Sequence, residues 1–231
     1  MGGTWALGDT SPVLWTRADT NVTSAGSPAL VSAWGDVRDG VDYEWAQANE
    51  VYQPHVSADA RGALLAFSAV TTETMECHEL AALGQGAATI AIACEISGAA
   101  AAVQGVVAFG NSSTGLAMRL LRYTSPDRVV WERYNDASQT ASIPVANPAP
   151  FAGTLVARYT GTALRLIANG AALSDVAFTG ALTTDRLMLG STNGVNYFLT
   201  ANVREVAVWD RALTDPEAAA VDASLRAAWG Y

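Results

Sequence analysis

Short runs of alternating apolar and polar residues follow one another along most of the chain, with turn residues between them. Alternation of this kind is typical of half-buried strands, and many short strands in succession indicate an antiparallel sandwich or barrel. Residues 89–96 give a strong pattern, with β-branched side chains at alternate positions. The predicted strands cover residues 13–15, 31–34, 63–67, 75–80, 89–96, 103–109, 116–122, 128–134, 138–143, 187–189 and 203–209.

Residues 154–170 predict a β-hairpin that is followed by a second tight turn. Two alternating runs flank Thr160-Gly161-Thr162, and Asn169-Gly170 follows the second run. An Asn-Gly pair favours a type I′ turn, because that turn needs positive φ angles at both central residues. The chain is therefore predicted to reverse direction at residues 169 and 170.

One helix is predicted over residues 214–229. Thr214 and Glu217 have the spacing of a capping box, in which each side chain bonds to the backbone N–H of the other residue. Pro216 fits the first turn, where its missing N–H is not needed. The face predicted to pack on the sandwich recurs at helical spacing and consists of Ala218, Val221, Leu225, Ala228 and Trp229.

Three segments resemble one known family. Residues 155–170 (LVARYTGTALRLIANG) resemble a hairpin of laminin G-like, or concanavalin A-like lectin/glucanase, jelly rolls. Residues 203–217 (VREVAVWDRALTDPE) are similar to the closing strand and helix of that family. The opening of the chain, PVLWTRAD at 12–19 with VSAWGD at 31–36, is similar to that of bacterial and phage members.

The resemblance implies an all-β fold, an antiparallel two-sheet jelly-roll sandwich with a short C-terminal α-helix. We expect one such sandwich over residues 11–231, including the helix, after an N-terminal extension of residues 1–10. Six of the seven tryptophans are expected to pack in the sandwich or to dock the helix, namely Trp5, Trp15, Trp34, Trp45, Trp209 and Trp229.

Composition excludes several partners. Hydrophobic residues make up 50% of the 231 residues, charged residues 15%, and the net charge is −9. The thirteen basic residues are all Arg and are scattered, whereas proteins that bind nucleic acids need clustered basic residues. We therefore expect no nucleic-acid partner and no docking on an anionic membrane. No apolar run reaches the roughly 18 residues that insertion as a helix requires, and no signal peptide is visible.

The chain offers few residues for catalysis, and we expect a non-enzymatic protein. Glucanases that resemble this family carry closely spaced acids on one strand, and a retaining mechanism needs two carboxyl groups about 5 Å apart. The nearest approach is Glu73, Glu76 and Glu79, whose spacing of three places successive side chains on opposite faces of a strand. Solvent-exposed positions at a strand edge are the preferred interpretation of these acids. Cys77 and Cys94 are expected to be buried free thiols, although neighbouring predicted strands would also let them pair.

Calcium is the one cofactor hypothesis. Asp36, Asp39 and Asp42 place three acids within seven residues, and laminin G-like domains sometimes bind Ca²⁺ at loop carboxylates. The spacing does not match an EF-hand, and solvated loop acids are the alternative. Binding of Ca²⁺ would raise the melting temperature relative to a sample with chelator.

Two stretches combine aromatic rings with amide groups, as carbohydrate sites do. The first holds Trp131, Tyr134 and Asn135 beside Arg133 and Asp136. The second holds Asn193, Asn196 and Tyr197, although Asn193-Gly194 is also a plain turn sequence. These six residues are the glycan-binding candidates, and roles in the core or in turns are the alternative.

The expected function is a surface protein of a phage or phage-like particle, in a tail, fibre or capsid, that binds host cell-surface glycan. A lectin-like domain without a visible leader fits a particle that is assembled in the cytoplasm and released by lysis. Its partners would be other virion proteins or copies of itself, and the low charge is compatible with a sizeable interface. Two alternatives stay open: a purely structural decoration or tail component, and a secreted extracellular bacterial adhesin that binds carbohydrate.

Overall fold

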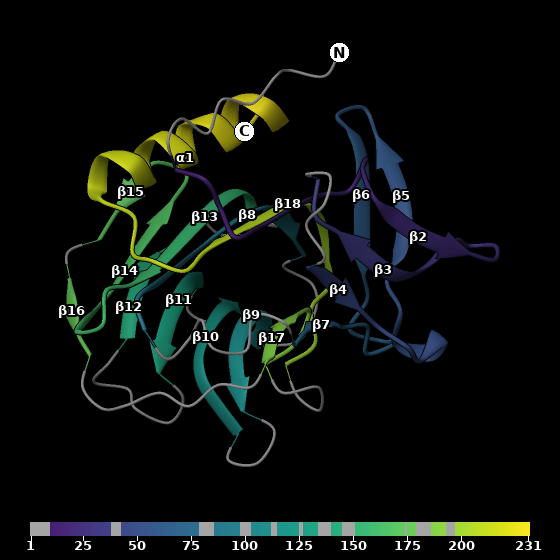
Figure 1. Cartoon of the computed structure of the whole chain (residues 1–231), viewed down its shortest axis with the longest axis horizontal. Helices are drawn as coiled ribbons and strands as arrows, with labels where there is room; N and C mark the ends of the chain where they lie inside the picture. The colour runs from purple at the N-terminus through teal and green to yellow at the C-terminus, as the bar shows by residue number, and fades with distance from the viewer. Residues whose placement is uncertain are drawn as a thin grey trace.

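The computed structural model describes the chain in segments. They are residues 10–37, 43–78, 86–97, 103–111, 115–124, 127–133, 140–144, 151–173, 175–178, 186–192 and 197–231. Within them the chain forms antiparallel strands in two layers and one helix near the C-terminal end, as Figure 1 shows. This confirms the predicted fold class. None of the described helices is long and apolar enough to cross a membrane.

The first sheet lies under the helix. In spatial order it contains β1 (Leu14–Arg17), β18 (Ala201–Trp209), β8 (Ala88–Ile96), β13 (Phe151–Tyr159) and β14 (Ala163–Ala168). The short strands β15 (Ala171–Ala172) and β16 (Val176–Ala177) pair with β14.

The second sheet contains β7 (Met75–Cys77), β17 (Arg186–Leu189), β9 (Val103–Asn111), β10 (Gly115–Thr124), β11 (Asp127–Arg133) and β12 (Thr140–Pro144). The N-terminal elements are β2 (Val22–Ala25), β3 (Leu30–Gly35), β4 (Glu44–Ala46), the 3₁₀ turn η1 (Glu50–Tyr52), β5 (His55–Asp59) and β6 (Gly62–Phe67). They join the two sheets at one side, because β6 pairs with β18 and β4 pairs with β7.

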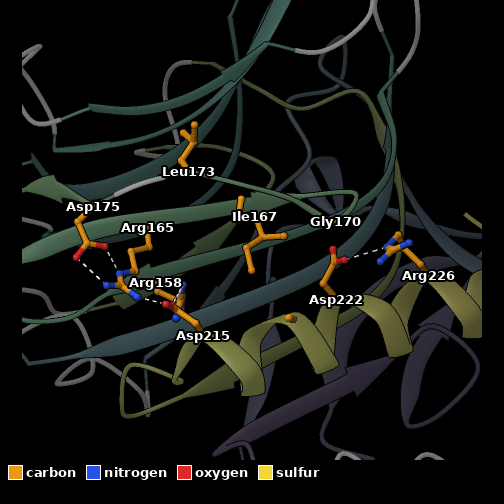
Figure 2. Close-up of a pocket in the computed structure, with 11 residues that line it drawn as sticks. Arg158, Arg165, Ile167, Gly170, Leu173, Asp175, Asp215, Asp222 and Arg226 are labelled. Atoms are coloured by element: carbon orange, nitrogen blue, oxygen red, sulfur yellow. Dashed lines mark hydrogen bonds and ion pairs between the residues drawn. The ribbon is translucent and has the colours of Figure 1, made fainter.

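The helix α1 (Asp215–Trp229) covers the outer face of the first sheet. Its N-terminus has the predicted capping box, in which the Thr214 backbone N–H donates to Glu217 Oε2 over 2.7 Å. Its buried side chains pack on outward-facing residues of β8, β13 and β18, and the strand β14 passes beside it (Figure 2). The predicted apolar face is confirmed except at Ala228, which is exposed because Asp222 and Trp229 occupy the inner side of the last turns.

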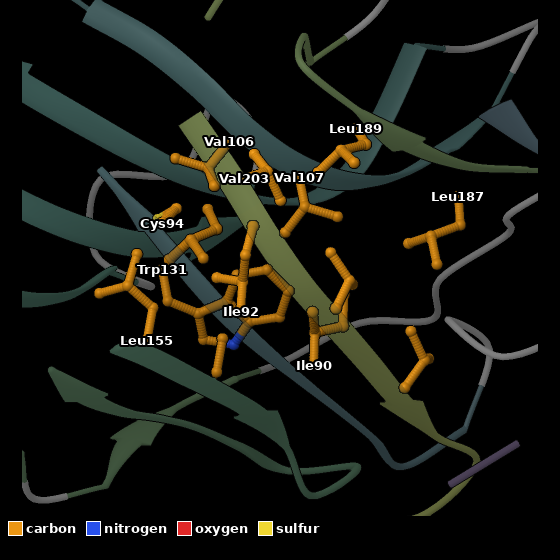
Figure 3. Packing of buried hydrophobic residues seen from close by; sticks show 14 of the residues in the cluster. Ile90, Ile92, Cys94, Val106, Val107, Trp131, Leu155, Leu187, Leu189 and Val203 are labelled. Carbon is orange, nitrogen blue, oxygen red and sulfur yellow. The ribbon is translucent and has the colours of Figure 1, made fainter. Parts of the chain in front are cut away.

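The main core lies between the two sheets. Ile92 and Leu155 point inward from the first sheet, and Val107 and Trp131 point inward from the second (Figure 3). Cys94 also lies in this core and Cys77 in the same cluster, and both are buried free thiols as predicted. Burial raises the pKa of Cys94, so its thiol stays protonated and unreactive at neutral pH.

The turn chemistry follows the sequence closely. Asn169 and Gly170 have φ angles of 48° and 82°, as a type I′ turn requires, and they join β14 to β15. The strands β2, β4 and β5 were not predicted. Their side chains are mostly exposed or half-buried, so an alternation of apolar and polar residues does not mark them.

Candidate functional site

The outer face of the second sheet carries a continuous row of neighbouring residues on six adjacent strands. The row runs across β7, β17, β9, β10, β11 and β12 and consists of Glu76, Met188, Ala108, Arg119, Glu132 and Thr140. Neighbours of the row along these strands, such as Leu120 and Trp131, point into the core. We call these residues, from Glu76 to Thr140, the outer row; Met188 and Ala108 within it are fully buried.

An ion pair occupies the centre of the outer row. Arg119 and Glu132 are cross-strand partners, with Arg119 Nη2 2.6 Å and Nε 2.8 Å from Glu132 Oε1. Both residues are less than a tenth exposed. The short contacts fix the guanidinium group and the carboxylate in one arrangement.

Tyr197 lies over this ion pair. The guanidinium carbon of Arg119 is 5.4 Å from the centre of the Tyr197 ring, and Tyr197 is 40% exposed. A tyrosine combines an apolar ring with a hydroxyl group, and part of Tyr197 is open to solvent.

The segment that carries Tyr197 is held against β9 by backbone contacts. The Gly105 N–H donates to the Tyr197 carbonyl over 2.5 Å, and Leu199 N–H donates to Gly190 O over 2.9 Å. A Cβ atom at position 105 would come within 2.9 Å of Ser191 and Thr192, so only glycine permits this close approach. Tyr197 itself has a φ angle of +56°, which few non-glycine residues adopt. The tyrosine is therefore presented by a tightly held segment.

A second contact between an arginine and an aromatic ring lies four residues further along β10, at Tyr123. Arg128 on β11 is the cross-strand partner of Tyr123, with its guanidinium carbon 4.7 Å from the centre of the ring. Burial raises the pKa of Tyr123, so its hydroxyl group is neutral at physiological pH and can donate a hydrogen bond. This part of the face adds hydrogen-bonding capacity beside the Arg119–Glu132 pair.

The interpretation of Trp131 as a glycan-binding residue is wrong. Its side chain is fully buried, and the indole Nε1–H donates to the Arg158 carbonyl over 3.1 Å. The ring also meets Phe109 edge-on, with 6.2 Å between the ring centres. Because β11 alternates, Trp131 faces the core while Glu132 takes the outward position.

Of the five other glycan-binding candidates, one lies in the described part of the chain and four do not. Tyr197 is at the surface, as the hypothesis requires, and its role stays a prediction. Tyr134, Asn135, Asn193 and Asn196 lie outside the described residues. In the chain the first two follow β11 directly, and Asn196 immediately precedes Tyr197.

The calcium hypothesis rests on residues that are mostly not described. Asp36 is buried and accepts a hydrogen bond of 2.8 Å from the Trp15 N–H, whereas Asp39 and Asp42 lie outside the described residues. In the described part of the chain, no group of three or more His, Cys, Asp or Glu side chains could hold a metal ion. Calcium binding remains a prediction.

The acids considered for catalysis have other partners. Glu73 is buried, not solvated as we expected, because it accepts hydrogen bonds from the Ser68 N–H (2.6 Å) and the Thr71 hydroxyl (2.7 Å). Burial raises its pKa. Glu76 forms an ion pair with Arg186 at 3.1 Å, and Glu79 lies outside the described residues.

A comparison with family models settles the family. The model of the concanavalin A-like lectin/glucanases superfamily matches residues 69–219. The chain belongs to this superfamily. The matched part includes β7 to β18 and the first turn of α1, and so contains the outer row and Tyr197. A comparison with curated protein sequences gives no match.

Solved structures share the fold of this superfamily member at low sequence identity. A Trypanosoma rangeli sialidase in complex with the inhibitor DANA has a TM-score of 0.63 and 13% identity, over 90% of this chain and 32% of that chain. The covalent intermediate of that sialidase with 2,3-difluorosialic acid has a TM-score of 0.65 and 12% identity, over 96% and 34%. The chain thus spans about a third of the sialidase.

This chain covers a larger share of a smaller solved structure. The CBM40 of the Ruminococcus gnavus IT-sialidase, bound to α2,3 sialyllactose, has a TM-score of 0.50 and 20% identity, over 61% of this chain and 84% of that chain. These likenesses show the fold alone.

The ion pair of the outer row was missed in the sequence. Arg119 stands between the apolar residues Met118 and Leu120, which was an indication of an outward-facing charge, whereas Glu132 stands between Trp131 and Arg133 and carries no such indication. Their pairing depends on the β10–β11 register, which the sequence pattern alone does not give.

Proposed function

We propose that the protein binds carbohydrate at Tyr197 and the outer row of the second sheet. The observation that carries the proposal is the exposed Tyr197 ring held over the Arg119–Glu132 ion pair. The ring offers an apolar surface to one face of a sugar, while guanidinium and carboxylate groups can donate to and accept from hydroxyl groups. The superfamily and the likeness to a sialyllactose-bound domain support the same choice of ligand class.

Replacement of Tyr197 by alanine is expected to weaken glycan binding at least tenfold, equivalent to about 1.4 kcal/mol. A glycan array that includes α2,3 sialyllactose identifies the ligand, and titration calorimetry then compares the variants. Tyr52 has a similar exposure of 41% on η1, so Tyr52→Ala is a matched control that should bind like the wild type. An array without binding, or equal affinity of Tyr197→Ala and wild type, would contradict the proposal.

The proposed activity is binding without catalysis. The carboxylates of Glu73, Glu76 and Glu132 are all engaged by hydrogen bonds or ion pairs within the protein, which does not favour a nucleophile and acid free to act on a sugar. We expect no release of 4-methylumbelliferone from its sialic acid conjugate and no new reducing ends from polysaccharides above the buffer rate. Product formation proportional to protein concentration would show an enzyme instead.

We propose that the protein lies on the surface of a phage or phage-like particle, where it contacts host glycan. The support is the resemblance of the opening segments at 12–19 and 31–36 to bacterial and phage members, and these segments contain β1 and most of β3. Gold-labelled antibody in electron microscopy should decorate a tail, fibre or capsid. If the antibody labels a particle but the protein binds no glycan on the array, a purely structural component is favoured. If the protein is exported from the cell and no particle is labelled, a secreted adhesin is favoured.

A further inference from the structure

A groove runs between α1 and the strands β14 and β15, on the outer face of the first sheet and thus on the side away from Tyr197. Its volume is about 660 Å³, within the range of ligand sites. Figure 2 shows ion pairs at both ends and Ile167 between them. The apolar part of its lining consists of Ile167, Ala172, Leu173 and Ala219.

One end of the groove presents carboxylate oxygens. Asp215 Oδ1 accepts from Arg165 and, over 2.7 Å, from Arg158, which is 3% exposed and also donates to Leu213 O. Asp215 Oδ2 has no partner among the described residues, and the side chain is 66% exposed. Asp175 binds the far side of Arg165 over 2.7 Å. The guanidinium groups lower the pKa of Asp215, so its carboxylate stays ionised at neutral pH. The charges of Arg158 and Arg165 balance those of Asp215 and Asp175, and what this end offers is the open acceptor Oδ2.

The other end presents guanidinium donors. Asp222 is buried and is already satisfied by the Thr154 hydroxyl at 2.5 Å and by Arg226 Nε at 2.9 Å. Within the described part of the chain, the two Nη groups of Arg226 have no partner, and a third of its side chain is exposed. The Nη2 atom lies 3.2 Å from the position of a Cβ atom at Gly170, so the donors border the groove.

The spacing of the two ends defines the size of the occupant. Asp215 precedes Asp222 by seven residues and Arg226 by eleven on α1, which is about 11 to 16 Å along the helix. An extended chain covers that distance with roughly three to five residues. None of the lining residues is aromatic, in contrast to Tyr197 at the proposed carbohydrate site.

We propose that this groove binds an extended peptide segment, with a basic side chain at Asp215 and an acidic group at Arg226. Small apolar side chains of the peptide would lie on Ile167 and Ala219 between the two ends. Each end is balanced in charge by its ion pairs, but the open acceptor of Asp215 at one end and the open donors of Arg226 at the other give the peptide one direction. The proposal does not depend on carbohydrate binding, because the two sites lie on different sheets.

Synthetic peptides of three to five residues test this inference on an array with the labelled full chain at low salt. One set has Lys first and Glu last with Ala, Val or Leu between them, a second reverses the two charges, and a third has Gln at both ends. We expect at least tenfold stronger binding of one charged orientation than of the Gln set. Equal binding of all sets, or no binding, would overturn the proposal.

Two neighbouring helix positions supply the matched variants. Ala219 lines the groove and Ala220 does not, and both are exposed on α1. Ala219→Trp should abolish peptide binding without breaking an ion pair, whereas Ala220→Trp should leave it intact. Tyr197→Ala should also leave peptide binding intact, which separates this site from the proposed function. Loss of carbohydrate binding in Ala219→Trp, with peptide binding unchanged, would assign the groove to a glycan and overturn the proposal.

Discussion

The Trp131→Ala variant is expected to lose about 3 to 5 kcal/mol of folding free energy, as large-to-small changes at buried tryptophans do. The side chain is fully buried between the sheets, so its removal leaves a cavity beside Phe109. The Arg158 carbonyl also loses its hydrogen bond from the indole. Urea unfolding followed by circular dichroism measures the change.

The same variant separates the two interpretations of Trp131. At a temperature where it is still folded, Trp131→Ala should bind glycan with nearly the affinity of the wild type. Trp131→Phe, which retains most of the buried ring, should recover part of the lost stability. A Trp131→Ala protein that is as stable as the wild type but has lost glycan binding would place this tryptophan at the ligand.

The second large effect is expected at Trp229, the last residue of α1. Trp229 is 5% exposed, and its indole donates to Glu205 Oε2 over 2.8 Å. Glu205 is fully buried, with Trp15 Nε1 2.5 Å from its other oxygen. Trp229→Ala should therefore cost about 3 to 5 kcal/mol, because it opens a cavity under the helix and removes one donor from a buried carboxylate.

Trp229→Phe removes the hydrogen bond together with part of the indole ring, and the pH-dependent part of its effect reports the hydrogen bond to Glu205. Burial raises the pKa of Glu205 above that of an unfolded glutamate, against the opposing effects of the two indoles and Arg17. The stability contributed by its titration is therefore present at low pH and is lost as pH rises through the pKa of the folded protein. Removal of an indole donor raises this pKa further, so the ionised form is destabilised more than the protonated one.

The expected difference between wild type and Trp229→Phe is about 1.5 to 3 kcal/mol at pH 7, and it should shrink at pH 4. Acid destabilisation through Asp59 and Asp215, whose pKa values are lowered by arginines, affects both proteins equally and cancels in the difference. Urea unfolding at several pH values gives the comparison. A difference that is constant or that grows toward pH 4 would contradict the assignment to Glu205.

Most of the fold could be predicted because its strands alternate or carry turn residues at their ends. The predicted strand at 89–96 is β8 (Ala88–Ile96), and the predicted helix differs from α1 by one residue. The missed strands β2, β4 and β5 lie at one side of the sandwich, where few side chains are fully buried. Their strand conformation depends on pairing with distant segments, which local patterns do not reveal.

The candidate site could be predicted only in part, because fully buried residues occur on both faces of the second sheet. Val130 and Trp131 are both fully buried, so the polarity of neighbouring residues does not show which of them faces the core. The position of Tyr197 depends on Gly105, more than ninety residues earlier in the chain. On α1, Asp222 shares a face with Ala218 and Leu225, but its burial and its hydrogen bond with Thr154 were not predicted.

The proposed carbohydrate site is tested most directly by a crystal structure of the full chain with the glycan that the array selects. We expect a sugar ring against the exposed face of Tyr197, with hydroxyl groups within hydrogen-bond distance of Arg119 or Glu132. A glycan bound elsewhere, in the groove beside α1 or at any surface without Tyr197, would contradict the proposed site.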